Sequence, residues 1–421
     1  MKLLYIENKF VLIYFLNSEI KKINHIFLIN LYLMFNFEFY NPTRIFFGKN
    51  QLEAINKCVP TDAKVLITLG GGSARRSGLI DKVRTILGSR KVFEFGGIEP
   101  NPRYETLMKA VELVRRENID FILAVGGGSV IDGTKFICLA SNYKGEPSNI
   151  LNSGFEGIKG ISKNDVLPFG TVLTLPATGS EMNSGAVITY NHGKFGIGSE
   201  YTFPVFSILD PTLTFTLPKI QVANGIVDAF VHVTEQYTTF PVDARLQDRM
   251  AEGILQTLIE IGKTTIDEPE NYDARANLMW CATMALNGLL RLGVPQDWTT
   301  HMIGHEITAM FGIDHGQTLA IIYPSVIEIK REQKRAKLIQ YAERVWHIDS
   351  GSDDEKINLA IRKTREFFES LGIKTRLSEY GITADKIPEL VNKLKEHGMT
   401  ALSETRDITP EVSQRILENA F

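Results

Sequence analysis

Short apolar runs alternate with amphipathic stretches from about residue 34 to residue 215. The four apolar runs, each followed by a turn that contains glycine, span residues 63–69, 91–95, 119–125 and 166–175. Residues 104–118 place apolar side chains at spacings of 3, 1 and 3, which predicts a helix between the second and third runs. Such alternation predicts a parallel sheet with helices on both faces, and burial on both faces explains the unbroken Val, Ile and Leu runs.

Strand signals stop after about Leu217-Pro218, and helical patterns follow to the end of the chain. The segments that we predict to be helical span residues 220–237, 246–261, 274–290, 299–311, 317–329, 336–345, 356–371 and 387–397. A chain of 421 residues is too long for one ordinary core. We therefore expect a Rossmann-like α/β domain over residues 34–215 and an all-helical domain over residues 216–421.

The first 33 residues differ from the rest, being dominated by Ile, Leu, Asn, Lys, Phe and Tyr. A secretory signal needs an unbroken apolar core and a small-residue cleavage site, and a transmembrane span needs about 20 apolar residues. Residues 17–19 (Asn-Ser-Glu) and 21–22 (Lys-Lys) interrupt the apolar runs, so neither alternative fits. We expect Met34 to be the natural start and residues 1–33 to be a non-native or dispensable extension.

The amino-acid composition mainly excludes some classes of protein. With 44% apolar and 23% charged residues, the chain is typical of a soluble globular enzyme. The 46 basic and 49 acidic residues are interspersed and form no basic stripe, so we expect neither a nucleic-acid partner nor a membrane partner. Three cysteines lie far apart, at Cys58, Cys138 and Cys281, which favours a reduced, cytoplasmic location.

Two of the predicted strands end in Gly-Gly-Gly-Ser, over residues 70–73 and 126–129. Glycine lets a backbone approach a phosphate, and the helix start that follows offers free N–H groups. Neither loop fits G-x-G-x-x-G, because Arg75 and Ile131 occupy the last glycine position, and neither fits a Walker A loop. One such loop could be a purely structural turn, but two in one domain favour nucleotide binding.

The first loop carries no acidic residue after its strand, whereas Arg75 and Arg76 follow it closely. An acid at this place would hold the ribose hydroxyls of NAD and repel a 2′-phosphate. The loop therefore favours NADP(H) over NAD, although both arginines could also simply face water.

Three of the eight histidines lie within fifteen residues, at His301, His305 and His315. A fourth, His232, follows Asp228 by four residues, so that both point the same way on a helix. The helix around Asp228 is otherwise apolar, and a buried Asp/His pair needs a partner such as a divalent cation.

A set of imidazole and carboxylate ligands suits Fe²⁺ or Zn²⁺ better than Ca²⁺ or Mg²⁺. The zincin motif HExxH is excluded, because Ala309 stands where its second histidine would be. Any single one of these histidines could be a hydrogen-bonded core residue, but the whole cluster favours a metal site.

Several long motifs then point to one family. They span residues 40–48, 96–102, 126–135, 175–181, 224–232 and 297–306. With these motifs in this order, the sequence from Asn36 to Phe421 resembles the iron-containing (group III) alcohol dehydrogenases, and most of all their NADPH-dependent butanol dehydrogenase and aldehyde reductase branch. The resemblance implies a dehydroquinate synthase-like fold, short-chain primary alcohols and aldehydes as substrates, and a cytoplasmic homodimer.

The resemblance also implies roles for single residues. The metal ligands would be Asp228, His232, His301 and His315, and His305 would be an unligated histidine near the nicotinamide, in the proton path. The cofactor contacts would be Gly71, Gly72 and Ser73 to the adenosine ribose and its phosphate, Gly127, Gly128, Ser129 and Asp132 to the pyrophosphate, and Thr174, Thr178 and Lys194 along the rest of the groove.

Three alternatives remain open from the sequence. A polyol dehydrogenase of the same superfamily would use a similar metal with NAD. A dehydroquinate-synthase-like lyase would need a basic pocket for a phosphorylated acid, and no run of Lys and Arg lies near the metal motifs. A non-catalytic metal or nucleotide sensor would consume no NADPH.

Overall fold

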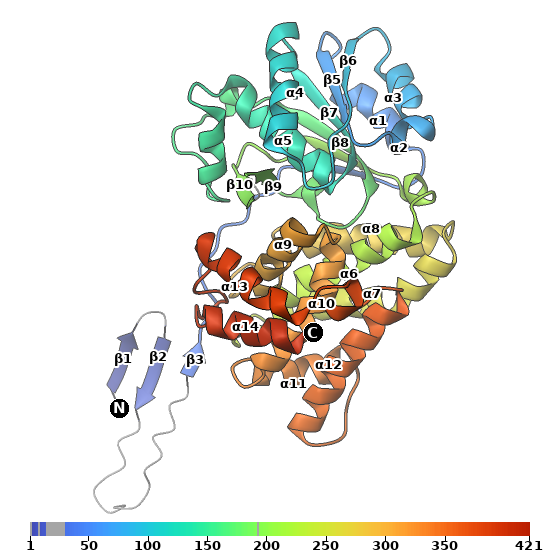
Figure 1. Ribbon diagram of the computed structural model, residues 1–421. Coiled ribbons are helices and arrows are strands. Elements are labelled where there is room, and N and C mark those ends of the chain that lie inside the picture. Colours follow the sequence, from blue (N-terminus) through green and yellow to red (C-terminus); the bar gives the residue numbers. More distant parts are fainter. Residues whose placement is uncertain (1, 7–8, 14–29, 192) are drawn as a thin grey trace, which may run out of the picture.

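The computed structural model describes residues 2–6, 9–13, 30–191 and 193–421, and Figure 1 shows an α/β part above a helical part. The extension expected over residues 1–33 falls largely outside the described residues, so its status stays a prediction. Its described segments form an antiparallel sheet of their own, from β1 (Lys2–Ile6), β2 (Lys9–Ile13) and β3 (Asn30–Tyr32). No described helix is both long and apolar enough to cross a membrane.

The α/β part is built on a six-stranded sheet in the order β4-β11-β8-β7-β5-β6, with every neighbouring pair parallel. Its strands are β4 (Arg44–Phe47), β5 (Lys64–Leu69), β6 (Lys91–Phe95), β7 (Phe121–Gly127), β8 (Phe169–Leu175) and β11 (Phe206–Leu209). The parallel sheet and four of its strands were predicted, whereas the four-residue strands β4 and β11 were not.

Helices cover both faces of this sheet. They are α1 (Ala54–Cys58), α2 (Ser73–Arg76), α3 (Leu79–Leu87), α4 (Tyr104–Glu117) and α5 (Gly128–Asn142). Along β7, Ile122 and Ala124 join the core under α4 and α5, whereas Leu123 and Val125 join the core under α1 and α3. This two-sided burial is the reason that the strand reads as a continuous apolar run.

An antiparallel hairpin, β9 (Gly185–Tyr190) and β10 (Gly193–Gly198), lies between the sheet and the helical part and was not predicted. Ala186, Ile188 and Ile197 of the hairpin join the core under α4 and α5. The hairpin therefore closes the α/β part on the side that faces the helices, and its strand β10 carries Lys194.

The helical part contains the helices α6 (Lys219–Tyr237), α7 (Arg245–Asp267), α8 (Tyr272–Ala285), α9 (Thr299–Phe311), α10 (His315–Ile329), α11 (Arg335–Arg344), α12 (Asp353–Ser370), α13 (Ile387–Glu396) and α14 (Pro410–Asn419). Short 3₁₀ turns are η1 (Gln51–Glu53), η2 (Pro147–Asn152), η3 (Lys163–Asp165), η4 (Ser180–Met182), η5 (Pro211–Thr214), η6 (Ser378–Tyr380) and η7 (Ala384–Lys386). Helix α8 ends five residues before the predicted end, because Leu286 leaves the helical conformation and Gly288 has φ +97°. Helix α14, which begins at Pro410, was not predicted.

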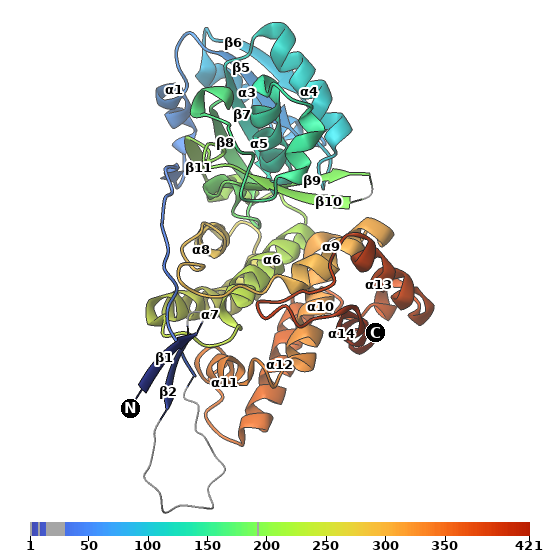
Figure 2. The same cartoon turned by 90° about the vertical axis from the view of Figure 1, so that its left-hand side faces the viewer.

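The segment over residues 34–43, here called the strap, contacts both parts before it enters β4. The backbone N–H of Phe35 donates to the carbonyl of Gly293 in the helical part (2.9 Å). The side-chain amide of Asn41 donates to the carbonyls of Met182 (2.8 Å) and Asn287 (3.1 Å), one in each part. Figure 2 shows the strap running along one edge of the molecule from the helices to the sheet.

Candidate metal and cofactor site

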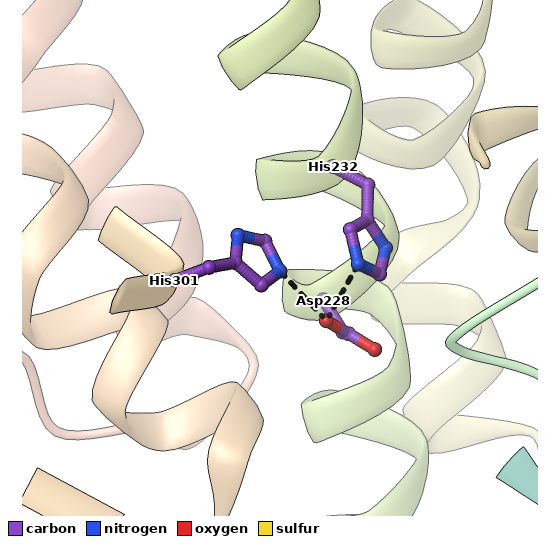
Figure 3. Close-up of side chains that lie close together, drawn as sticks. All are labelled: Asp228, His232 and His301. Atoms are coloured by element: carbon purple, nitrogen blue, oxygen red, sulfur yellow. Dashed lines mark ion pairs between the residues drawn. The ribbon is translucent and has the colours of Figure 1, made fainter. Parts of the chain in front are cut away.

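Three helices bring the predicted metal ligands together. Helix α6 begins after Pro218, and its residues from Gly225 to Tyr237 are all buried, including Asp228 and His232. Helix α9 supplies His301, and His315 is the first residue of α10. In Figure 3, Asp228 and His232 project from one helix toward His301 on another.

The ligand atoms converge on one carboxylate oxygen. The Nε2 atoms of His232, His301 and His315 lie 3.6, 3.7 and 3.7 Å from Oδ1 of Asp228. Ligand atoms of Asp228, His232 and His301 all lie within 4.8 Å of one another. Four ligands at about 2.1 Å from a tetrahedral ion are about 3.4 Å apart. The spacing of Asp228, His232 and His301 therefore fits a single divalent ion, and His315 lies beside the Asp228 carboxylate as the fourth candidate ligand.

The unpaired polar atoms of the cluster also indicate a metal site. Among the described residues, Oδ1 of Asp228 and Nε2 of His301 are buried without a hydrogen-bond partner. Buried polar atoms are normally paired, because an unpaired one costs free energy. A cation between these two atoms would satisfy both, so the residues fit a bound metal.

Burial and neighbouring charges set the pKa values of the cluster. Burial would raise the pKa of Asp228, but the surrounding histidines hold it below its ordinary value. Burial lowers the pKa of His232 to about 4 and that of His315 well below the ordinary value. Burial would also lower the pKa of His301, but Glu235 and Asp228 raise it to about 9. Apart from the proton on His301, the cluster is in the form that binds a metal.

His305 lies beside the cluster. Its ring centroid is 5.0 Å from that of His315 and 6.3 Å from that of His301. Burial lowers its pKa well below the ordinary value, and nearby Lys194 lowers it further. His305 is therefore a neutral imidazole next to the cluster.

Sequence reasoning missed Glu235, which contacts the cluster from behind. Its carboxylate hydrogen-bonds Nδ1 of His301 and accepts the backbone N–H of Thr300 (2.6 Å). The available signal was spacing: Glu235 follows Asp228 and His232 by seven and three residues, which is one face of a helix.

One cavity of about 860 Å³ joins the metal cluster to the glycine loops. Every residue predicted for the site lines it: Gly71, Gly72, Ser73, Gly127, Gly128, Ser129, Asp132, Thr174, Thr178, Lys194, Asp228, His232, His301, His305 and His315. The cavity has the size of a small-molecule site and takes its walls from both parts of the chain.

The glycine loops meet the cavity at helix starts. Gly72 has φ +100° and precedes α2, and Gly128 is the first residue of α5. A Cβ atom at Gly128 would lie well inside 3.0 Å of the Thr178 side chain. The free N–H groups at the start of α5 provide an anion site of the kind that binds phosphates.

The carboxylate of Asp132 is engaged inside the protein. One of its oxygens accepts the hydroxyl of Ser180 (2.7 Å), and the other accepts the N–H of Val187 (2.9 Å). The Ser180 hydroxyl also lies 2.7 Å from that of Thr178. Asp132 therefore ties the loop after β8 and the hairpin to α5.

The two arginines that follow the first glycine loop differ in whether an acidic residue pairs with them. Arg75 forms an ion pair with Glu94 of β6, which also pairs with Arg84. Arg76 is exposed, has no acidic partner among the described residues, and places its guanidinium near Gly72. Arg76 is therefore the free cation at this loop.

A second cation faces the cavity from the hairpin. Burial lowers the pKa of Lys194 to about 8, although Asp228 and Asp132 act in the opposite direction. Within the part of the chain that the structure describes, the Lys194 ammonium has no hydrogen-bond partner. It is available to an anionic group of a ligand.

The two parts of the site touch directly at Gly225, and a second close contact, at Gly316, lies within the helical part. A Cβ atom at Gly225 on α6 would overlap the carbonyl oxygen of Pro176, in the loop after β8. A Cβ atom at Gly316 on α10 would overlap the backbone of Asn224. The contact between Gly225 and Pro176 sets how close the metal ligands lie to the cofactor loops, and the contact at Gly316 sets how closely α10 packs on α6.

Comparisons with known proteins agree with this geometry. Residues 42–211 match the iron-containing alcohol dehydrogenase domain, and residues 222–421 match the C-terminal domain of the Fe-containing alcohol dehydrogenase family. The chain is 58% identical over 391 residues to the NADPH-dependent aldehyde reductase YqhD of Escherichia coli, covering 92% of this chain and 100% of that protein. It is 39% identical to NADH-dependent butanol dehydrogenase A of Clostridium acetobutylicum, with the same coverage of 92% and 100%.

The fold agrees as well. The crystal structure of Escherichia coli YqhD superposes with a TM-score of 0.89 at 57% identity, covering 92% of this chain and all of that one. The fold, the site and these relatives define an oxidoreductase that acts on the CH–OH group. The chain belongs to the iron-containing alcohol dehydrogenase family, as the sequence motifs predicted.

Proposed function

We propose that this protein is an NADP(H)-linked alcohol dehydrogenase and aldehyde reductase for short-chain primary alcohols and aldehydes. The observation that carries this proposal is one cavity with a four-ligand cluster and two glycine loops in its walls. The relative at 58% identity is named an NADPH-dependent aldehyde reductase, and another at 39% is named an NADH-dependent butanol dehydrogenase. The free Arg76 beside the first loop favours NADPH. A cytoplasmic homodimer, as the resemblance implies, is part of the proposal.

In this proposal Asp228, His232, His301 and His315 hold one divalent ion, Fe²⁺ or Zn²⁺. Such an ion, when bound, supplies Lewis-acid polarisation of the substrate oxygen, and the nicotinamide supplies or accepts the hydride. The ligand atoms of Asp228, His232 and His301 lie within 4.8 Å of one another, and Nε2 of His315 lies 3.7 Å from Oδ1 of Asp228, so the helices already bring the four candidate ligands to one place.

The other residues of the cavity bind, orient and move protons. The helix start at Gly128 and the cation of Lys194 bind the cofactor's phosphates and ribose. Neutral His305 accepts or passes a proton at a ring nitrogen. Because both parts of the chain form the cavity walls, the domains hold the two reactants in line, which converts an encounter into an intramolecular step.

The proposal is tested by NADPH oxidation with butanal, measured before and after chelation and after add-back of Fe²⁺ or Zn²⁺. We expect loss of turnover on chelation and recovery with the metal. A polyol dehydrogenase would instead prefer NAD with a diol, and a lyase or a sensor would consume no NADPH. No turnover with any metal would refute the proposed activity.

We predict that Arg76→Ala weakens NADPH binding selectively. A charge-assisted hydrogen bond contributes about 1.5–3 kcal/mol, and exposure of Arg76 places the effect at the lower end, so KM for NADPH rises roughly tenfold. KM for NADH and kcat stay unchanged. Steady-state kinetics with both cofactors measures this. Arg75→Ala is the matched control, because Arg75 is already paired with Glu94. An equal loss with NADPH and NADH would contradict the prediction.

A further inference from the structure

Glu235 binds the start of α9 at three points. Its backbone carbonyl accepts the N–H of Asp297 (2.8 Å), and one carboxylate oxygen accepts the N–H of Thr300 (2.6 Å). The other oxygen hydrogen-bonds Nδ1 of His301. Glu235 is 2% exposed, so water does not compete for these bonds. One residue of α6 thereby fixes both the helix start and the ring of a ligand on α9.

The contact with the ring determines which nitrogen of His301 is free. A carboxylate only accepts hydrogen bonds, so Nδ1 must carry the proton. When the ring gives up its second proton to bind a metal, the lone pair lies on Nε2, which is 3.7 Å from Oδ1 of Asp228 and otherwise has no partner among the described residues. Glu235 therefore selects the tautomer whose free nitrogen points at the other ligands.

The other two histidines lack such support. Nδ1 of His232 and Nδ1 of His315 are buried without a hydrogen-bond partner in the described chain. Within the described residues, His301 is thus the one ligand candidate whose second nitrogen is bound by a protein group. We propose that Glu235 is a positioning residue that holds His301 in the tautomer and orientation required for metal binding. The inference rests on the ligand set of the proposed function.

A buried ion-pair network anchors this arrangement from the far side. Asp297 accepts the N–H of Thr299 at the start of α9 (2.9 Å), and its other oxygen lies 2.9 Å from the ammonium of Lys334. Lys334 also pairs with Glu404 (2.9 Å) and donates to the carbonyl of Thr238 (2.8 Å). The start of α9 therefore cannot shift to follow a misplaced ring, so the orientation of His301 depends on Glu235.

The test is Glu235→Gln, loaded with Zn²⁺. A glutamine cannot accept from both Nδ1 of His301 and the N–H of Thr300, because one of its two terminal atoms only donates. We expect the affinity for Zn²⁺ to fall 10–100-fold, the usual effect of losing such a partner, and chelator-driven loss of Zn²⁺ to be correspondingly faster than in the unmodified protein. The increase in Tm that Zn²⁺ gives should shrink, because less metal remains bound.

Two further variants make the outcomes distinct. Glu252→Gln removes a carboxylate that is also buried, on α7, but bonded to Tyr237, Arg249 and Arg344. It should change the Tm of the apo protein while leaving the Zn²⁺ loss rate unchanged. Asp228→Asn removes a ligand and should abolish stoichiometric Zn²⁺ binding. If Asp228→Asn still binds one Zn²⁺ tightly, the ligand set of the proposed function is wrong.

If Asp228→Asn loses the metal but Glu235→Gln releases Zn²⁺ at the unmodified rate, the positioning role alone is overturned. If the Glu235→Gln variant does not fold, a measurement on the unmodified protein still tests the inference. Long-range ¹H–¹⁵N spectra of the Zn²⁺-loaded chain report which nitrogen of each histidine ring carries a proton. We expect the Nδ1 proton of His301 to resonate further downfield than the Nδ1 protons of His232 and His315, because it alone is hydrogen-bonded to a carboxylate, and the absence of that shift would refute the inference.

Discussion

His301→Ala is expected to abolish both metal binding and turnover while leaving NADPH binding largely intact. The side chain is one of three imidazoles around Oδ1 of Asp228, and its loss leaves a buried carboxylate with too few partners. Lewis-acid stabilisation by a bound ion is worth several kcal/mol in the transition state, so kcat/KM should fall by more than about 10³-fold. The cofactor loops come from the α/β part and do not depend on this ring.

Three measurements check this result: metal content by mass spectrometry, NADPH oxidation with butanal, and NADPH titration followed by fluorescence. His347→Asn is the matched control. His347 is exposed and has φ +54°, a conformation that asparagine tolerates. This control should keep its metal and its rate. Full activity in His301→Ala would remove His301 from the proposed ligand set.

The second large effect is expected from Gly225→Ala. The added methyl group would overlap the carbonyl oxygen of Pro176, a backbone atom that cannot rotate away. Helix α6, which carries Asp228 and His232, would have to move by roughly 1 Å relative to the loop after β8, and a shift of this size can lower the rate about 10²-fold. We expect kcat/KM to fall by that factor while metal content and NADPH affinity, measured separately, stay close to normal.

Gly253→Ala is the control for this variant. Gly253 lies within α7, and a Cβ atom there would meet no atom within 4 Å. Alanine should stabilise the helix by about 0.5–1 kcal/mol and leave kcat/KM unchanged. If Gly225→Ala were as active as Gly253→Ala, the contact with Pro176 would not control the distance between the two halves of the site.

The hydrophobic pattern of the sequence predicted those helices and strands whose own residues carry a clear apolar periodicity or run. The helix expected over residues 299–311 coincides with α9, and the longer strands were found because each is a continuous apolar run. The strands β4 and β11 have only four residues each, and their pairing depends on neighbours far away in sequence. The hairpin β9–β10 was missed because Gly193, Gly196 and Gly198 dilute the alternation of β10.

In the site, too, residues on one helix could be related from their spacing, whereas contacts between distant elements could not be predicted. Asp228 and His232 could be paired from their spacing on one helix, whereas His301 and His315 were assigned through the family motifs. The structure shows convergence that spacing alone does not reveal, because it depends on how three helices cross. The spacing of Glu235 places it on the helix face of Asp228 and His232 but does not reveal its bond to His301, and the ion pair between Arg75 and Glu94 depends on how α2 packs beside β6.

The strap has a consequence for how the chain folds during synthesis. The side-chain amide of Asn41 donates a hydrogen bond to the carbonyl of Asn287, and these two residues are 246 positions apart in the sequence. At about 5–20 residues per second, a ribosome needs roughly 10–50 s to make the second after the first. Before then the strap can contact the α/β part, where the ring centroids of Tyr40 and Phe203 lie 6.1 Å apart, but not the helical part. The strap therefore completes its contacts with the helical part, at Gly293 and Asn287, only after the whole α/β part has been made.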